Sequence, residues 1–140
     1  MKHRIFNGVT VTVLGLLVSL GPQFLFKACG PLVGSDGPAW MKCHWSVQAE
    51  LGMGALIAAL GIAILVFRSR DIRLGLLVGV LFAAVPALLV PHVLIGGCAM
   101  RTMACQALTF PAITVLAVLL LFFSAGNIFY FIQKRKEKKA

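Results

Sequence analysis

Long runs of uncharged, mostly apolar residues alternate with short charged segments along this chain. The first run covers positions 5–26, between Arg4 and Lys27, and contains twenty-two residues. At a rise of about 1.5 Å per residue, a helix of this length matches a hydrocarbon core of roughly 30 Å. Three later runs have the same character. The pattern therefore predicts four membrane-spanning helices, at about residues 5–26, 46–67, 74–95 and 111–132.

Prolines fall near the ends of two of these spans. Pro86 and Pro91 lie in the second half of the third span, where we expect them to bend or end the helix, because proline lacks a backbone N–H and clashes with the preceding turn. Pro111 suits the first turn of the fourth span. We expect the first span to be kept as a helix, because it is longer than the apolar core of roughly 7–15 residues in a cleaved signal peptide.

Composition narrows the class of protein. Of the 140 residues, 60% are hydrophobic and only 12% are charged, whereas roughly 25% are charged in a typical soluble domain. So few charges cannot cover a water-soluble fold, so the apolar surface must face lipid. We predict an all-α integral membrane protein. Residues 1–133 would form one domain of four antiparallel transmembrane helices, and residues 134–140 a basic tail.

The basic residues are distributed unevenly between the segments that connect the spans. Ten of the thirteen lie in the N-terminal tail, the middle loop and the C-terminal tail. They are Lys2, Arg4, Arg68, Arg70, Arg73, Lys134, Arg135, Lys136, Lys138 and Lys139. This bias predicts that both termini and the middle loop lie in the cytoplasm and that the other two loops lie outside. It also accounts for the net charge of +9 without a nucleic-acid partner, and it suits a bilayer with anionic lipid.

Small residues recur at helical spacing in three of the spans, where they allow helices to approach closely. They are Gly8, Thr12, Gly15 and Ser19 in the first, Gly54, Ala58 and the row Ala55, Ala59 and Ala63 in the second, and Gly75, Gly79 and Ala83 in the third. Packing within the bundle is favoured over contact with another subunit. The fourth span is bulkier, and we expect it to face lipid more than the other spans do. Its Ser124 and Asn127 should be hydrogen-bonded locally or to a neighbour.

All four cysteines lie in the two predicted outer loops. Cys29 and Cys43 belong to the first, and Cys98 and Cys105 to the second. An even number of cysteines in an oxidising compartment predicts two disulfides. Three connectivities are possible, of which pairing within each loop needs no long-range geometry. We therefore favour in-loop pairing and leave the cross-loop alternatives open.

Two alternatives give these cysteines a chemical role. The outline of four helices with two outer cysteine pairs resembles the quinone-coupled thiol oxidases, but the Cys-x-x-Cys pair of such enzymes is missing. The second alternative is an outer copper site, because soft sulfur ligands favour Cu(I). Its candidate ligands are Cys43, His44, Cys98, Met100, Met103 and Cys105. We expect no cofactor otherwise, since the sequence contains no nucleotide-binding motif and no nucleophile–base motif.

Four residues at the outer end are candidates for contact with a membrane partner: Trp40, His44, Trp45 and Glu50. Glu50 lies at least one turn inside the second span, where ionisable groups usually face the bundle interior or a partner. An ion pair with Lys42 or Arg101 at the headgroup level is the alternative for this residue.

Two motifs suggest a family. Lys42-Cys43-His44-Trp45 stands before Ala49-Glu50-Leu51-Gly52, and Ile95-Gly96-Gly97-Cys98 is separated from Cys105 by six residues. With these motifs the chain resembles a family of small bacterial four-helix membrane proteins classified only as a domain of unknown function. The resemblance implies the fold and assigns no activity. Together with the small-residue faces, it suggests a non-enzymatic accessory or interaction subunit of a transporter-type complex, whose partner is another integral membrane protein or a second copy.

Overall fold

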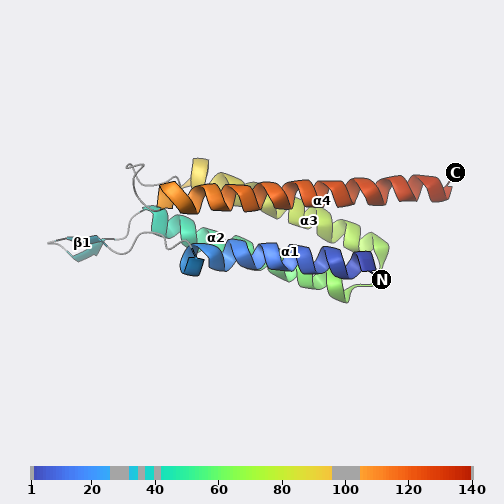
Figure 1. Cartoon of the computed structure of the whole chain (residues 1–140), viewed down its shortest axis with the longest axis horizontal. Helices are drawn as coiled ribbons and strands as arrows, with labels where there is room; N and C mark the ends of the chain where they lie inside the picture. Colours follow the sequence, from blue (N-terminus) through green and yellow to red (C-terminus); the bar gives the residue numbers. More distant parts are fainter. Residues whose placement is uncertain (1, 26–31, 35–36, 40–41, 96–104, 140) are drawn as a thin grey trace.

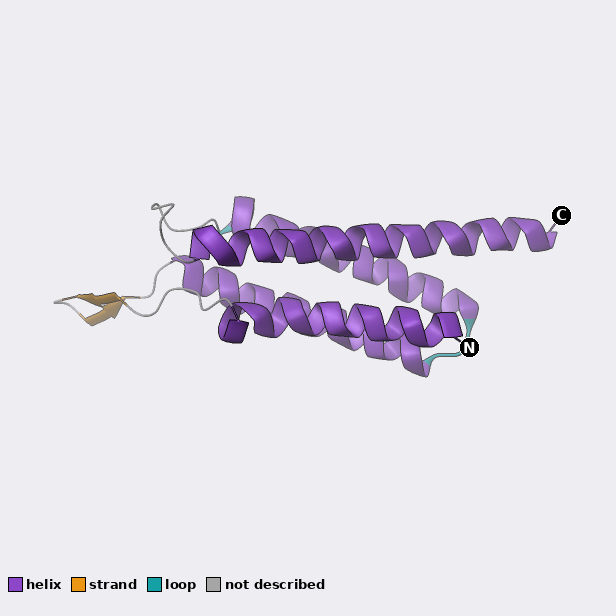
Figure 2. Cartoon of the chain, viewed as in Figure 1, coloured by secondary structure: helices purple, strands orange, loops and turns teal. Residues whose placement is uncertain are grey.

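Four long helices and a small hairpin make up the fold (Figure 1). The structure, a computed structural model, describes residues 2–25, 32–34, 37–39, 42–95 and 105–139. The long helices are α1 (Lys2–Leu20), α2 (Lys42–Val66), α3 (Arg70–Leu89) and α4 (Phe110–Lys139). Three π-helical turns extend them: η1 (Gly21–Leu25) after α1, η2 (Val90–Leu94) after α3, and η3 (Cys105–Thr109) before α4. Helices therefore dominate the described chain, as Figure 2 shows.

The helices confirm the prediction of a multi-pass membrane protein. Four segments are long and apolar enough to cross a bilayer: Ile5–Leu25, His44–Val66, Arg70–Leu94 and Ala107–Glu137. Their helical ends differ from the predicted bounds. α2 begins at Lys42 rather than at 46, and α4 runs on through residues 134–139, which we expected to be a separate tail. Charge marks the edges of the hydrocarbon, but arginine, lysine and glutamate are good helix formers and let a helix continue past that edge.

A β-hairpin interrupts the expected all-α pattern. Strands β1 (Leu32–Gly34) and β2 (Gly37–Ala39) pair in antiparallel fashion, with Leu32 opposite Ala39. The hairpin projects beyond the helices at one end of the bundle (Figure 1). Hydrophobic alternation could not have predicted it, because each strand has three residues and glycine or proline supplies much of their length.

Contacts between small residues join α1 to α2, which pack on each other more extensively than any other pair among the described elements. Gly15 lies against Ala58, so that a Cβ at residue 15 would come within 2.5 Å of the Ala58 nitrogen. Gly54 lies against Ser19, and Gly61 against Thr12. Residue numbers fall along α2 as they rise along α1, so the two helices run in opposite directions. The predicted packing role is confirmed for the face of α1 and for the Gly54–Ala58 motif.

Other small residues do not serve this purpose. Gly75 has open space where a Cβ would stand, and Gly79 makes only an ordinary contact with Leu60 at 3.7 Å. Ala55 and Ala59 are exposed on the outside of the bundle. The expectation of packing within the bundle is therefore wrong for Gly75, Ala55 and Ala59, because their sides of α3 and α2 face away from the other helices.

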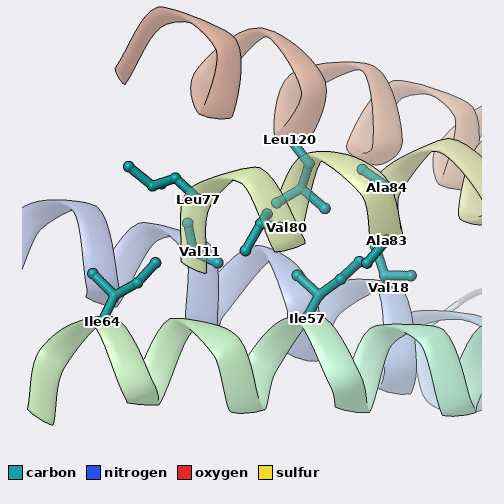
Figure 3. Close-up of a cluster of buried hydrophobic side chains, with 9 residues drawn as sticks. All are labelled: Val11, Val18, Ile57, Ile64, Leu77, Val80, Ala83, Ala84 and Leu120. Carbon is teal, nitrogen blue, oxygen red and sulfur yellow. The ribbon is translucent and has the colours of Figure 1, made fainter. Parts of the chain in front are cut away.

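The core lies between all four helices. Its buried side chains are Val11 and Val18 from α1, Ile57 and Ile64 from α2, Leu77, Val80, Ala83 and Ala84 from α3, and Leu120 from α4 (Figure 3). α4 also buries Ile113, Ala117 and Ser124 on the same side. One side of α4 thus belongs to the core, whereas Leu119 and Phe122 on its other side are exposed.

Candidate functional site

The three π-helical turns lie at the same end of the bundle, together with the start of α2. We call this the π-helical end. Pro22 is the second residue of η1 and Pro91 is the second residue of η2, and both are buried. Proline cannot donate the i-to-i−4 hydrogen bond and its ring crowds the preceding turn, which favours the wider turn. In η2 the Ile95 N–H accordingly bonds to the Val90 carbonyl, five residues back, at 3.1 Å.

Glu50 lies inside the bundle near this end. It is 0% exposed, and it belongs to the buried side of α2 with Ser46, Val47 and Gly54. Neither carboxyl oxygen has a hydrogen-bond partner among the described residues. Helix geometry explains this interior position, since Glu50 is four residues from Ser46 and four from Gly54 and therefore shares their face. The expected contact of Glu50 with a membrane partner stays a prediction.

The aromatic residues at the start of α2 have a different position. Trp45 is 60% exposed, and the His44 ring meets it edge-on with centroids 5.9 Å apart. His44 itself is half-buried. Trp40, the remaining candidate for a partner contact, lies outside the described residues. Trp45 is thus the only one of the four candidates with a described position that offers most of its side chain to a neighbour.

A polar contact that the sequence analysis did not predict joins η2 to α4. His92 Nε2 and the Thr114 hydroxyl are 2.8 Å apart, and Thr114 Oγ1 also donates to the Phe110 carbonyl at 2.7 Å. His92 is exposed, as expected for an interfacial residue. The partners are twenty-two positions apart in the chain, a separation that matches no helical or motif spacing and could not have suggested this contact.

One side of α2 is exposed along its whole length, and we call it the α2 outer face. Its residues are Trp45, Gln48, Gly52, Ala55, Leu56, Ala59, Ile62 and Val66. Gly52, Ala55 and Ala59 in the middle of the face are small and lie beside the larger Leu56, and a Cβ at Gly52 would meet nothing within 4 Å. The exposed side of α1 is different, because Val9, Val13, Leu16 and Leu20 fill it with bulky side chains.

The cysteines and methionines predicted as disulfide partners or copper ligands cannot be placed. The side chains of Cys29, Cys43, Cys98, Met100, Met103 and Cys105 all lie outside the described residues. Within the described part of the chain, no three histidine, cysteine, aspartate or glutamate side chains come close enough together to hold a metal ion. The disulfide pairing and the copper alternative therefore stay predictions.

The opposite end of the bundle is basic and carries both chain termini (Figure 1). Arg68, Arg70, Lys134, Arg135 and Lys136 are all exposed there. Two cations lie over aromatic rings: the Arg73 guanidinium is 5.5 Å from the centre of the Phe131 ring, and Lys134 Nζ is 5.5 Å from that of Tyr130. We call this the basic end.

Most of the chain matches the model of one protein family. Residues 11–130 match the model of the family described as Domain of unknown function (DUF4418). The chain belongs to this family. The expected resemblance is thereby confirmed, and the match spans Glu50, η1, η2, η3 and the α2 outer face. No curated protein and no solved structure matches the chain.

Proposed function

We propose that this DUF4418 protein is a non-enzymatic accessory subunit, which binds a transmembrane helix of another integral membrane protein along the α2 outer face. The family resemblance suggests a transporter-type complex as the class of partner. A second copy of the chain is the alternative occupant, and the experiment below separates the two.

The exposed small residues of α2 carry this proposal. Lipid chains fill the space beside bulky and small residues alike, so small residues gain a packing role mainly where another backbone approaches. Gly15, Gly54 and Gly61 already have that role inside the bundle. Gly52, Ala55 and Ala59 have the same small size on the outside, where no described helix covers them. A partner helix would cover them, with the exposed Trp45 at one end of the contact.

The orientation in the membrane belongs to the same proposal. Exposed arginine and lysine side chains at the basic end support a cytoplasmic position for this end and for both termini, by the positive-inside rule. The π-helical end would then face the outside of a bacterial cytoplasmic membrane. A membrane-impermeant thiol reagent tests this on cysteine-free variants that carry one new cysteine at Arg70 or at Val93, both exposed. Labelling at 93 alone in intact cells is expected, and labelling at 70 alone contradicts the orientation.

Added bulk on the outer face tests the partner contact. Ala55→Leu and Ala59→Leu should reduce the amount of a larger complex that is extracted from native membranes with a mild detergent, because leucine keeps the partner backbone at a distance. The matched control is Val13→Leu on the bulky exposed face of α1. Native gels and mass spectrometry of the complex would report its size and its members. The proposal fails if the complex is unchanged, or if it contains only copies of this chain.

A further inference from the structure

Glu50 is a buried acid without a described partner. Its side chain is 0% exposed, and both carboxyl oxygens lack a hydrogen bond from any described residue. An ionised carboxylate in such surroundings is costly unless a positive charge neutralises it. The function of this site therefore depends on which positive charge neutralises Glu50.

Contacts between helices give the depth of Glu50 in the bundle. Gly54, one turn further along α2, lies against Ser19 of α1, and Ser19 Oγ donates to the Leu51 carbonyl at 3.2 Å. Two residues after Ser19, α1 changes into η1. Glu50 is thus level with the end of α1, and α2 also contacts η2, the π-helical turn that follows α3.

The ends of these two helices offer oxygen acceptors rather than donors. α1 and α3 continue into η1 and η2, but the buried Pro22 and Pro91 have no N–H, so each leaves a carbonyl group of the preceding turn without its helical donor. α2 begins at the same end of the bundle, but Glu50 is eight residues after Lys42 and lies beyond the free N–H groups of its first turn. η3 begins at Cys105, nine residues before Thr114, which contacts His92 of η2. The first N–H groups of η3 therefore lie nearer the π-helical end of the bundle than this contact does.

The described side chains at this end supply no permanent positive charge. Besides Glu50, only His44 and His92 can titrate among the described side chains of α2, η1, η2, η3 and the adjoining parts of α1, α3 and α4. His44 lies six residues earlier on α2, and its ring contacts Trp45. His92 is exposed and lies 2.8 Å from the Thr114 hydroxyl. Neither histidine donates a hydrogen bond to the carboxyl group of Glu50.

We propose that Glu50 binds one small monovalent cation from solution, either a proton or an alkali ion such as Na⁺. A proton would make the carboxyl group neutral, and its O–H would donate to a backbone carbonyl at the end of α1 or α3. An alkali ion would leave the carboxylate ionised and take carbonyl oxygens as further ligands, as unwound helix ends do in membrane transporters. Both ions fit the same site, because each can bind one carboxyl group that is surrounded by oxygen acceptors. This inference does not depend on the proposed partner helix.

The small number of acids in the chain makes a direct test possible. Asp36, Glu50, Asp71 and Glu137 are the four acidic residues. The triple variant Asp36→Asn, Asp71→Asn, Glu137→Gln keeps Glu50 as the sole acidic side chain, so infrared spectra of the full chain in dodecyl maltoside micelles, which contain no carboxyl or ester groups, report its protonation state. Adding Glu50→Gln assigns the band. If that variant does not fold, the triple variant still answers the question, because only the C-terminal carboxylate accompanies Glu50.

Three results are distinguishable at neutral pH. A band of a protonated carboxylic acid, unchanged by Na⁺, shows the proton-binding form. Carboxylate bands that shift when Na⁺ replaces choline, with a rise in Tm of several degrees that Glu50→Gln abolishes and Glu137→Gln retains, show the alkali form. Carboxylate bands and a Tm that both ignore Na⁺ would overturn the proposal, because a basic side chain such as Lys42 or Arg101 would then neutralise Glu50.

Discussion

The side-chain amide of Asn7 donates a 2.6 Å hydrogen bond to the amide oxygen of Asn127, which ties α1 to α4. Asn127 in turn donates to the Phe123 carbonyl at 2.8 Å, and this bond orients its side chain toward Asn7. Contact between α1 and α4 is otherwise much less extensive than between α1 and α2. A polar bond therefore closes the bundle on the side where packing is thinnest.

This bond should be measurable by a double-mutant cycle. Asn7→Ala leaves the Asn127 oxygen without its donor, and the coupling free energy between the two residues should be about 0.6 kcal/mol and at most about 1.7 kcal/mol, as for other hydrogen bonds between membrane helices. The measurement is reversible unfolding in mixed micelles of Asn7→Ala, Asn127→Ala and the double variant. Strictly additive effects would contradict a direct bond.

The close approach of α1 and α2 predicts opposite effects for two glycine substitutions. Gly15→Ala places a Cβ 2.5 Å from the Ala58 nitrogen, where backbone must move, and should lower the free energy of unfolding by roughly 1–3 kcal/mol. Gly52→Ala is the matched control, because its Cβ meets open space and alanine is the better helix former by up to about 1 kcal/mol. Equal stabilities of the two variants in detergent would contradict the packing described here.

Substitution of two buried serines by alanine should also affect the free energy of unfolding differently. Ser124 is buried and its hydroxyl has no hydrogen bond among the described residues, so Ser124→Ala should leave the stability unchanged or raise it slightly. Ser19 donates to the Leu51 carbonyl, so Ser19→Ala should cost about 0.5–1.5 kcal/mol. Unfolding of both variants under one set of conditions checks the pair, and a larger loss for Ser124→Ala would show a bond that the structure lacks.

Disulfide pairing within the first outer loop stays a prediction, and the positions of its two cysteines in the sequence allow a direct test. Leu32 pairs with Ala39, and these residues follow Cys29 by three positions and precede Cys43 by four. The two cysteines thus stand at nearly equal distances along the chain from a paired position. Digestion without reduction, followed by mass spectrometry, should yield a peptide that links Cys29 to Cys43 and a second that links Cys98 to Cys105. Free thiols or a peptide that joins the two loops would contradict this pairing.

Most of the fold could be predicted from the sequence, because a bilayer imposes a strict length and polarity on each span. The face of Gly8, Thr12, Gly15 and Ser19 likewise predicted a helix contact that the structure confirms. The exact helix ends could not be predicted, since charged residues such as Lys134 continue a helix as readily as they end an apolar run. The π-helical turns could not be predicted either, because a proline in the sequence is compatible with a bend, an end or a wider turn of the helix.

The sequence predicted that Glu50 lies inside the membrane span, but it could not predict which side chains surround its carboxyl group. The position of Glu50 inside the second span indicated an interior group, yet its missing partner depends on which neighbours the other helices bring near it. The same holds for the exposed alanines of α2. Their spacing matches that of buried small residues, and only the placement of the other helices shows that Ala55 and Ala59 face outward.

Site-specific photo-crosslinking in living cells tests the central claim most directly. A photoreactive amino acid at Ala55 lies in the middle of the α2 outer face, and the same amino acid at Val13 lies on the exposed bulky face of α1. The account predicts one discrete product from position 55, which joins this chain to a different integral membrane protein, and no such product from position 13. Crosslinks to lipid alone, or equal products from both positions, would contradict an accessory subunit that binds through α2.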